Sequence, residues 1–307
     1  MLRVSFCDPS CEPQPWVDDL RAFLPGMVVE NWSDGDAPAD YAVAWAPPQR
    51  FIDQQTRLRA LFNVGAGVDK LLGLQLPPGL RVIRLDDAGM GVQMAEYVCH
   101  AVIRHFREFA AYEDQAEQGS WVRRKPRSRA EFAVGILGLG VLGQQVAAAL
   151  RQFEFPLLGW SRGVRQVDGI RCFSGSEGLP EFLSRCQALV CLLPLTPDTR
   201  NILGRENLSR LAPGAYLVNV ARGDHVVDDD LLALLDSGHL SGATLDVFRV
   251  EPLPAEHPFW RHPRIRVTPH ISAQTLRAES IMQIAGKILA LERGEPVAGI
   301  VDLARGY

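Results

Sequence analysis

The chain has 307 residues, of which 47% are hydrophobic and 22% are charged, and its formal net charge at pH 7 is −4. The length allows two domains, and this composition is ordinary for a globular protein. The small negative charge gives no overall reason to expect a nucleic acid or an anionic membrane as a partner. No apolar run approaches the roughly 20 residues that span a bilayer, and residues 1–9 lack a long apolar signal core.

The cysteines are scattered along the chain and form no Cys-x-x-Cys pair. Neither a zinc site nor a disulfide framework is therefore expected, and no bound metal is predicted. Cys99, Cys186 and Cys191 stand among apolar residues, as buried thiols do. These features predict a reducing, cytoplasmic compartment.

The first hundred residues alternate short apolar runs with helical stretches, and Pro and Gly separate them. This pattern predicts a small parallel α/β sheet. Its strands are expected at Leu2–Phe6, Met27–Glu30, Tyr41–Trp45, Leu61–Val64 and Arg81–Arg84. A long helix is expected next, from about Gln93 to Gln118.

A basic run, Arg123–Arg129, follows that helix and has five cations in seven residues. Such a run could indicate nucleic-acid binding. It has no interleaved aromatic residues and belongs to no recognition fold, so we interpret it as a solvated connection.

From Phe132 the β-α-β pattern starts again and supplies six more strands, which complete a doubly wound nucleotide-binding sheet. A helix expected over Ala273–Glu292 has one apolar face and would pack back on the first domain. The fold class predicted is therefore α/β with two Rossmann-like domains. A dinucleotide-binding domain of residues 99–272 would be inserted into a flavodoxin-like substrate domain of residues 1–98 and 273–307. The six strands are Ala133–Leu137, Leu157–Trp160, Ala188–Leu192, Ala215–Val220, Ala243–Val247 and Ile265–Val267.

A glycine-rich loop, Gly138-Leu139-Gly140-Val141-Leu142-Gly143, directly follows an apolar strand and opens a helix. These two contexts turn a weak pattern into a credible dinucleotide loop. The first glycine permits the tight turn, and the second lets the backbone approach a pyrophosphate. The third lets the helix pack on the strand, and the helix N-terminus attracts the phosphate charge.

The end of the second strand of this domain, Leu157–Trp160, bears on the choice between NADH and NADPH. An enzyme that uses NAD usually has Asp or Glu there, to bind the ribose hydroxyls. Here the strand continues into Ser161 and Arg162, which could receive a 2′-phosphate instead. Although an exposed surface arginine is common on loops, the missing carboxylate and the present cation both favour NADPH over NADH.

Three residues follow three consecutive strand ends: Arg222, Glu251 and His270. Arginine binds a carboxylate through two parallel bonds, and histidine exchanges its proton most easily near neutral pH. A carboxylate against the far ring nitrogen would orient the histidine and favour its protonated form. Each residue alone is more often a structural or surface residue. Because all three follow strand ends, they are expected at the same sheet edge as the glycine loop. This arrangement predicts an enzyme that binds a 2-oxo acid by its carboxylate and protonates its carbonyl oxygen while a hydride is transferred to the carbonyl carbon.

In the first domain a strand runs into the glycine turn Gly65-Ala66-Gly67-Val68-Asp69. Its exposed N–H groups could bind a carboxylate. A plain tight turn is an equally good interpretation of this sequence.

The chain resembles the D-isomer-specific 2-hydroxyacid dehydrogenase family, and within it the short bacterial glyoxylate/hydroxypyruvate reductase A type. The resemblance covers nearly the whole chain. Besides the glycine loop and the turn at Gly65–Asp69, it rests on Asp87–Tyr97, Leu193-Pro194-Leu195-Thr196-Pro197, Asn219–Gly223, Gly242–Phe248 and Val267–Ala273.

The resemblance implies that Arg222 binds and polarises the substrate, that His270 is the acid/base and that Glu251 is its partner. It also implies backbone binding of the substrate carboxylate by Ala66 and Gly67, and a pocket shaped by Trp45, although a core aromatic is an equally good interpretation of Trp45. The implied coenzyme residues are Gly138, Gly140, Val141, Leu142, Gly143, Trp160, Ser161, Arg162, Leu193, Pro194, Val220, Ala221, Arg222, Asp246, His270, Ser272 and Ala273.

The function predicted is NADPH-dependent reduction of glyoxylate to glycolate and of hydroxypyruvate to D-glycerate. The alternatives are a D-lactate-type or other 2-oxo acid reductase, and a non-catalytic dinucleotide-sensing corepressor on the same fold. The resemblance further implies a homodimer formed through the long helix and the arm that follows it. Neither a nucleic acid nor a membrane is expected as a partner.

Overall fold

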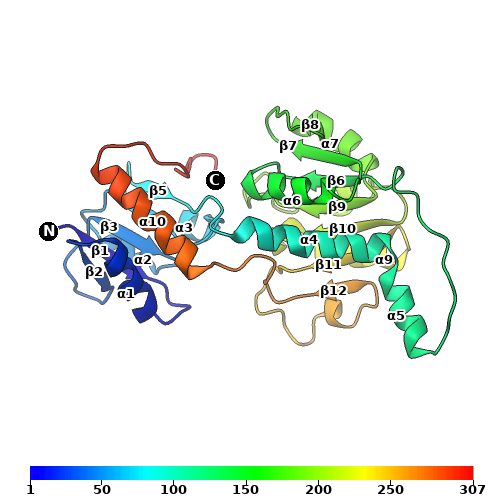
Figure 1. The fold of residues 1–307 in the computed structure, drawn as a ribbon, viewed down its shortest axis with the longest axis horizontal. Helices are drawn as coiled ribbons and strands as arrows, with labels where there is room; N and C mark the ends of the chain where they lie inside the picture. Colours follow the sequence, from blue (N-terminus) through cyan, green and yellow to red (C-terminus); the bar gives the residue numbers. More distant parts are fainter. Residues whose placement is uncertain (307) are drawn as a thin grey trace. The chain divides into compact units, whose positions relative to one another are not determined.

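The computed structural model describes residues 1–306 and divides the chain into two compact units (Figure 1). Unit 1 consists of Met1–Met90 together with the segment from Thr275 onward, and unit 2 is Gly91–Gln274. Unit 2 is thus an insertion between two parts of unit 1. The functional boundaries at residues 98/99 and 272/273 stay a prediction.

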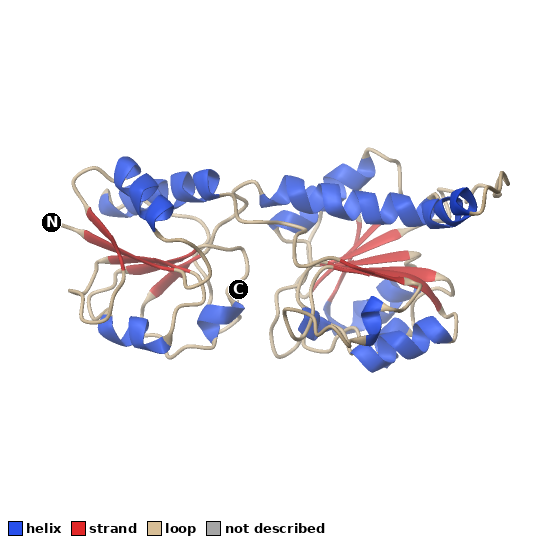
Figure 2. Cartoon of the chain, turned by 90° about the horizontal axis from the view of Figure 1, so that it is seen from below, coloured by secondary structure: helices blue, strands red, loops and turns tan. Residues whose placement is uncertain are grey.

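Unit 1 is a five-stranded parallel sheet in the order β2-β1-β3-β4-β5, which is the flavodoxin-like order. Figure 2 shows helices on both faces of this sheet, and a parallel sheet covered in this way has apolar strands. β3 accordingly has no exposed residue. The strands are β1 (Arg3–Cys7), β2 (Val28–Asn31), β3 (Tyr41–Ala44), β4 (Ala60–Asn63) and β5 (Arg81–Ile83), and the helices are α1 (Gln14–Phe23), α2 (Gln49–Gln54), α3 (Asp69–Leu72) and α10 (Arg277–Glu292).

The terminal helix α10 packs beside α1 in unit 1 (Figure 1). Its apolar face is buried, and Ile281, Ile284 and Ile288 are almost inaccessible to solvent. The predicted return of the chain to the first domain is therefore confirmed. The helix begins at Arg277 rather than at Ala273.

Unit 2 is a seven-stranded parallel sheet in the order β12-β11-β10-β9-β6-β7-β8. The order reverses between β6 and β9, and doubly wound sheets bind ligands outside the carboxyl ends of the strands at such a point. The two-domain α/β fold is thus confirmed. The strands are β6 (Val134–Leu137), β7 (Leu157–Ser161), β8 (Arg171–Ser174), β9 (Ala188–Cys191), β10 (Ala215–Asn219), β11 (Leu240–Leu245) and β12 (Ile265–Val267).

The edge strand β8 was not predicted from the sequence. The segment Arg171–Ser174 has no apolar run that would signal a strand, because its four residues are exposed or half-buried at the edge of the sheet. The remaining helices of unit 2 are α4 (Met90–Phe106), α5 (Phe109–Glu117), α6 (Val141–Arg151), α7 (Gly175–Ser184), α8 (Arg205–Leu208) and α9 (Asp228–Asp236). No helix within residues 1–306 combines the length and the apolar character needed to cross a membrane.

The prediction of one continuous helix over residues 93–118 is wrong, because the chain bends between α4 and α5. Glu108 adopts a left-handed backbone conformation with φ of 55°. Its carboxylate pairs with Arg124 at 2.8 Å and with Arg127 at 3.5 Å. These ion pairs join the bend to the basic run, and no local Gly or Pro signals it in the sequence.

The basic run is partly occupied by contacts within the chain. Besides Arg124 and Arg127, which pair with Glu108, Arg129 lies 4.9 Å from the ring centres of both Phe106 and Phe155. Cations placed over aromatic rings gain a favourable electrostatic interaction. The run therefore fastens the segment after α5 to unit 2, in keeping with its interpretation as a connection.

Candidate active site

The glycine loop joins β6 to α6 at the point where the strand order reverses. Gly138 has a φ of 103°, and a Cβ atom there would lie 2.7 Å from the Leu192 carbonyl oxygen. A Cβ atom on Gly143 would lie 1.9 Å from the Gly138 carbonyl oxygen. These two positions therefore require glycine, because no side chain fits between the loop, the helix and the neighbouring strand end.

Gly140 differs, because a Cβ atom there would meet no heavy atom within 4 Å. Gly140 is exposed and precedes α6, whose N-terminus has no side-chain cap. The first N–H groups of an α-helix have no partner within the helix and attract anions. The loop is thus open to solvent where the pyrophosphate of a dinucleotide would need to approach, so the residues present fit that group.

At the end of β7 the structure places Ser161 and Arg162 in different surroundings. The Ser161 hydroxyl is buried and donates a hydrogen bond to the Gly163 carbonyl, at 2.8 Å. The Arg162 side chain is 47% exposed and lies 3.7 Å from the exposed carboxylate of Asp198. The Arg162 side chain is therefore partly exposed beside a carboxylate, whereas the Ser161 hydroxyl already stabilises the turn.

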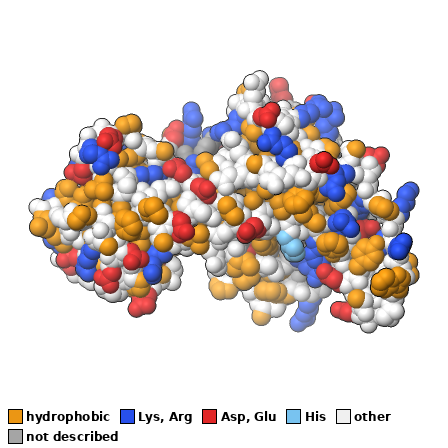
Figure 3. Space-filling model, viewed as in Figure 1, with side chains coloured by type: hydrophobic (Ala, Val, Ile, Leu, Met, Phe, Trp, Pro, Cys, Tyr) orange, Lys and Arg blue, Asp and Glu red, His pale blue; other side chains and the backbone are white. Residues whose placement is uncertain are grey.

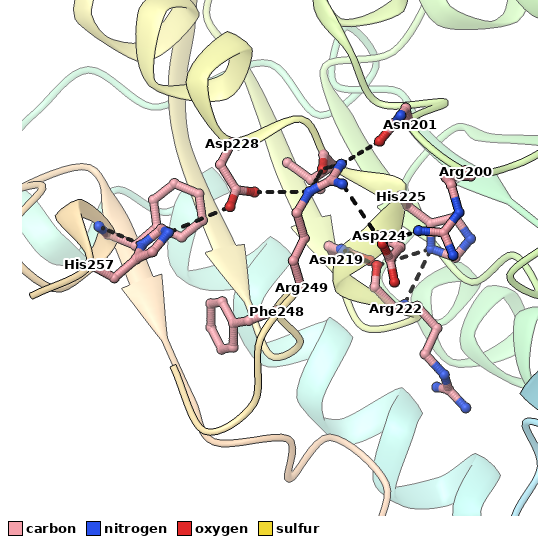
Figure 4. Close-up of polar contacts among 12 residues, drawn as sticks. Arg200, Asn201, Asn219, Arg222, Asp224, His225, Asp228, Phe248, Arg249 and His257 are labelled. Atoms are coloured by element: carbon pink, nitrogen blue, oxygen red, sulfur yellow. Dashed lines mark hydrogen bonds and ion pairs between the residues drawn. The ribbon is translucent and has the colours of Figure 1, made fainter. Parts of the chain in front are cut away.

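Arg222 follows β10, and two buried side chains hold its backbone. The Asn219 amide donates to the Arg222 carbonyl at 2.9 Å, and the Arg222 N–H lies 3.3 Å from Nδ1 of His225. The other ring nitrogen of His225 lies 3.3 Å from the Pro194 carbonyl. In Figure 4 the Arg222 guanidinium extends away from these groups. The loop is therefore fixed through its backbone, while the side chain projects outward.

Glu251 and His270 form a direct pair. Nδ1 of His270 lies 2.8 Å from one Glu251 oxygen, and the other oxygen accepts the Phe248 N–H at 2.9 Å. Both side chains are partly exposed, His270 by 43% and Glu251 by 37%. A carboxylate against Nδ1 fixes the ring orientation and leaves Nε2 to face a ligand. The predicted partnership of Glu251 with His270 is thus present as a contact, and their catalytic roles stay a prediction.

The pKa of the Glu251 carboxyl is set by its burial and by its neighbours. Burial is the largest single influence and raises the pKa of this carboxyl, while hydrogen bonds from His270 and Phe248 lower it. The positive charges of His270 and Arg222 act in the same direction, and the net pKa is below the ordinary value. Arg222 thus lies near enough to Glu251 to lower its pKa, while Glu251 contacts His270 directly.

Asp246 lies at the end of β11 and is fully buried. One of its oxygens accepts the Ile271 N–H at 2.9 Å and the Thr268 hydroxyl at 2.6 Å, and the other accepts the Ser272 N–H at 2.8 Å. In the structure Asp246 therefore holds the loop that carries His270. The predicted role of Asp246 in coenzyme binding is not tested by this arrangement.

The backbone of His270 is itself unusual, with a φ of 54° in the left-handed region. That conformation costs about 1–2 kcal/mol for an L-amino acid other than glycine. The His270 N–H donates to the Asp246 carbonyl at 2.9 Å, which helps to hold it there. Residues in such conformations cluster at functional sites.

Gly223 brings the two loops of the site against each other. A Cβ atom on Gly223 would lie 1.9 Å from the Phe248 carbonyl carbon and 2.3 Å from the Arg249 nitrogen. The backbone after Arg222 therefore touches the backbone before Glu251 with no room for a methyl group. Any side chain at position 223 would force the two loops apart.

In unit 1 the predicted turn after β4 is organised by Asn63. This buried residue donates its side-chain amide to the carbonyls of Gly65, at 2.7 Å, and Gly67, at 2.9 Å. The Trp45 ring packs against the turn so closely that a Cβ atom on Gly65 would lie 2.6 Å from Cζ3. Trp45 and Ala66 are half-buried, so both are partly open to solvent in unit 1.

The other predicted coenzyme residues are distributed over the strand ends of unit 2. Trp160 lies in the core and donates its indole N–H to the Gly175 carbonyl, at 2.9 Å. The remaining ones are buried or half-buried after β9, after β10 and after β12: Leu193, Pro194, Val220, Ala221, Ser272 and Ala273. Within the glycine loop, Val141 is exposed and Leu142 is half-buried.

Asn63, Asn219, Gly223 and His225 were not singled out as site residues by their sequence. Asn63 and Asn219 share a recognisable signal, because each is a buried polar residue at the last position of an apolar strand. Buried polar groups need hydrogen-bond partners, and the side-chain amide of each asparagine donates to the turn that follows. The roles of Gly223 and His225 depend on contacts between distant segments and have no such local signal.

Comparisons with known proteins agree with this architecture. Residues 99–272 match the family model "D-isomer specific 2-hydroxyacid dehydrogenase, NAD binding domain". The chain is 46% identical to the glyoxylate/hydroxypyruvate reductase A of Serratia proteamaculans and 43% identical to that of Yersinia enterocolitica, over the full length of each.

Two solved structures are similar over nearly the whole chain. One is a D-isomer specific 2-hydroxyacid dehydrogenase of Xanthobacter autotrophicus in complex with NADPH and MES. It has a TM-score of 0.94 and 39% identity, with 99% of each chain covered. The other is the NADPH-dependent glyoxylate/hydroxypyruvate reductase of Sinorhizobium meliloti in complex with NADP and sulfate. It has a TM-score of 0.92 and 34% identity, with 100% of each chain covered. The chain belongs to the D-isomer-specific 2-hydroxyacid dehydrogenase family.

Proposed function

We propose that the protein is an NADPH-dependent reductase of small 2-oxo acids that converts glyoxylate to glycolate and hydroxypyruvate to D-glycerate. The observation that carries this proposal is the Glu251–His270 pair, joined at 2.8 Å, in the neighbourhood of Arg222. The names of the relatives from Serratia and Yersinia support the substrates. The NADPH and NADP in the two similar solved structures support the cofactor.

Each member of the trio has a distinct role in this reaction. The Arg222 guanidinium binds the substrate carboxylate and polarises the carbonyl, because its planar fork matches a carboxylate. Nε2 of His270 donates a proton to the carbonyl oxygen, while Glu251 orients the ring and balances its positive charge. The open glycine loop and Arg162 would hold NADPH, which supplies the hydride when bound.

The proposed function is tested by steady-state turnover of the purified chain with NADPH and a panel of 2-oxo acids. We expect the highest kcat/KM with glyoxylate and hydroxypyruvate. A clear preference for pyruvate would indicate a D-lactate-type reductase instead. Binding of NADPH without turnover of any 2-oxo acid would indicate a non-catalytic, dinucleotide-sensing protein.

Arg162 supplies the first mutational prediction, because it stands where an NAD enzyme has an acid. Arg162→Asp should lower kcat/KM with NADPH by roughly ten- to hundredfold, since a hydrogen bond to a charged group is worth about 1.5–3 kcal/mol. Efficiency with NADH should fall much less. Initial rates with each coenzyme at saturating glyoxylate measure the change.

Arg185→Asp is the matched control for Arg162→Asp. The Arg185 side chain is 46% exposed, close to the 47% of Arg162. Arg185 lies between α7 and β9, before the amino end of a strand, whereas Arg162 follows the carboxyl end of β7. The control changes the net charge equally and should leave coenzyme preference unaltered. A wild-type enzyme that prefers NADH, or an unchanged preference in Arg162→Asp, contradicts the assignment.

We further propose that the turn after β4 binds a carboxylate oxygen through the N–H groups of Ala66 and Gly67. The Asn63 amide supports this interpretation, because it binds the carbonyls of Gly65 and Gly67 and so fixes the turn. A role of Trp45 in shaping the substrate pocket is part of the same proposal.

The apolar surface of α5 and of the arm after it supports a homodimer. Phe109 is 40% exposed, Tyr112 38%, Trp121 93% and Val122 60%. Figure 3 shows hydrophobic side chains gathered over α5. Exposed apolar patches of this kind mark interaction sites. We propose that a second copy covers this surface, and a monomer mass in sedimentation equilibrium at micromolar protein would contradict it.

A cytoplasmic location is part of the proposal. All six cysteines are free in the described structure. Burial raises the pKa of the Cys186 thiol and raises that of Cys191 to about 12, which makes these thiols unreactive. Free, buried thiols fit a reducing compartment.

A further inference from the structure

We propose that Arg249 is a positioning residue that holds the loop of Glu251 in register with the loop of Arg222. The proposal rests on the proposed function, because it concerns the alignment of the same three catalytic groups. It assigns a task to a residue that stands two positions before Glu251 and that the mechanism itself does not use.

The Arg249 side chain crosses from its own loop to the loop of Arg222. Its Nε donates to the Val226 carbonyl at 2.8 Å, and one terminal nitrogen donates to the same carbonyl and to the Asn201 side chain. The other terminal nitrogen lies 3.7 Å from Asp224. Figure 4 shows the guanidinium between Asp228 on one side and Asn201 and Asp224 on the other. The planar fork thus joins a backbone carbonyl and two side chains at once.

Asp228 anchors the Glu251 loop at two points. Its carboxylate lies 3.8 Å from Nε of Arg249 and 3.5 Å from Nε2 of His257. Arg249 precedes Glu251 and His257 follows it, so both flanks of the loop meet one carboxylate at the start of α9. The His257 ring also packs on Phe259, with ring centres 4.5 Å apart. The loop therefore meets the Asp228 carboxylate at two points and is also held by packing.

The contacts of Arg249 and Asp228 lie where they can affect both the alignment of Glu251 and the packing of the Arg222 loop. Arg249 adjoins Phe248, whose N–H binds the Glu251 oxygen that does not contact His270. The same stretch of backbone touches Gly223, the residue after Arg222. A shift of Arg249 would therefore move the N–H that aligns Glu251 and would loosen the packing against the Arg222 loop. Misplacement of about 1 Å can cost roughly 10²-fold in rate.

Arg200 offers a matched control, because it pairs with the same carboxylate as Arg249, that of Asp224. Its side chain is 51% exposed and it lies outside the Glu251 loop. Arg200→Lys and Arg249→Lys both keep the charge and lose the planar fork. Only the second change removes a contact that links the two loops.

The test compares kcat/KM for glyoxylate against pH in the wild type and both lysine variants. Arg249→Lys should lower kcat/KM by roughly tenfold to a hundredfold and shift the fall of activity at high pH to lower pH. Affinity for NADPH should be unchanged. In a Glu251→Gln background, Arg249→Lys should not shift the fall of activity at high pH any further, because the Glu251 carboxylate that Arg249 aligns is already absent. Arg200→Lys should resemble the wild type throughout.

The ring titration of His270, followed by NMR in the resting protein, gives a second readout that does not depend on turnover. Arg249→Lys should move its midpoint to lower pH. An unchanged midpoint or an equal shift in the Glu251→Gln background overturns the positioning role. A folded Arg249→Lys protein that has lost NADPH binding also overturns it. A wild type that reduces no 2-oxo acid refutes the proposed function, while the titration still decides the role of Arg249.

Discussion

Replacing His270 with alanine should lower kcat/KM for glyoxylate by roughly 10²–10⁴-fold and abolish the fall of activity at high pH. Positioned acid catalysis contributes a factor of that size. The Nδ1 contact with Glu251, at 2.8 Å, leaves Nε2 as the nitrogen for the proposed proton transfer. Without the ring, the carbonyl oxygen must take its proton from water. No side chain that loses a proton at high pH would then cause activity to fall.

Glu251→Gln tests the electrostatic part of the pair. The carboxyl has a pKa below its ordinary 4.5, so Glu251 stays ionised throughout the neutral and alkaline range. Its negative charge favours the imidazolium over the neutral ring. Reduction requires the imidazolium, so activity falls as pH rises and the ring loses its proton. With the charge removed, that fall should begin at lower pH.

The measurement is kcat/KM against pH for the wild type, Glu251→Gln and His270→Ala, with circular dichroism spectra to confirm folding. Glutamine keeps the shape of the side chain, so the control for packing is built into the substitution. If the limb of Glu251→Gln stays in place or moves to higher pH, Glu251 is not the electrostatic partner of His270.

Arg222→Lys should reduce glyoxylate turnover by orders of magnitude even though the charge is kept. Lysine has one compact ammonium group and cannot form two parallel bonds with a carboxylate. The backbone of Arg222 is held by Asn219 and His225, and the guanidinium adds one hydrogen bond to the Ala221 carbonyl, at 2.7 Å. The loop should therefore keep its conformation, and NADPH affinity should change little.

Fluorescence titration with NADPH and initial rates with glyoxylate separate these two effects. Arg200→Lys serves again as the charge-conserving control, because Arg200 is an exposed residue outside the trio. Loss of coenzyme binding together with activity in Arg222→Lys would show that Arg222 serves the cofactor site instead.

The local order of the sequence predicted the fold well, because buried parallel strands are continuous apolar runs. The glycine loop and the trio could be placed at one sheet edge because parallel strands end at the same edge. The resemblance to a known family then supplied the pairing of Glu251 with His270. Two features were not predicted. The strand β8 at the sheet edge lacks an apolar run, and the bend at Glu108 is joined to arginines 16 and 19 residues away.

The remaining features of the site depend on contacts that no local pattern reveals. The need for glycine at position 223 arises from the backbone at Phe248, which is distant in sequence. The left-handed conformation of His270 results from the hydrogen bonds that Asp246 and its loop form. Asn63 and Asn219 could have been found from their place at strand ends, whereas the partners of Arg249 could not.

The insertion of unit 2 as one uninterrupted stretch, Gly91–Gln274, has an evolutionary consequence. The glycine loop, Arg162, Arg222, Glu251 and His270 are all encoded within it, whereas Trp45 and the turn after β4 are encoded before it. If these residues have their proposed roles, a single double-crossover event between related genes would transfer coenzyme choice and proton chemistry together. The recipient gene would keep its own Trp45 and its own turn. Recombination can therefore vary these two sets of properties independently in descendants of such a chain.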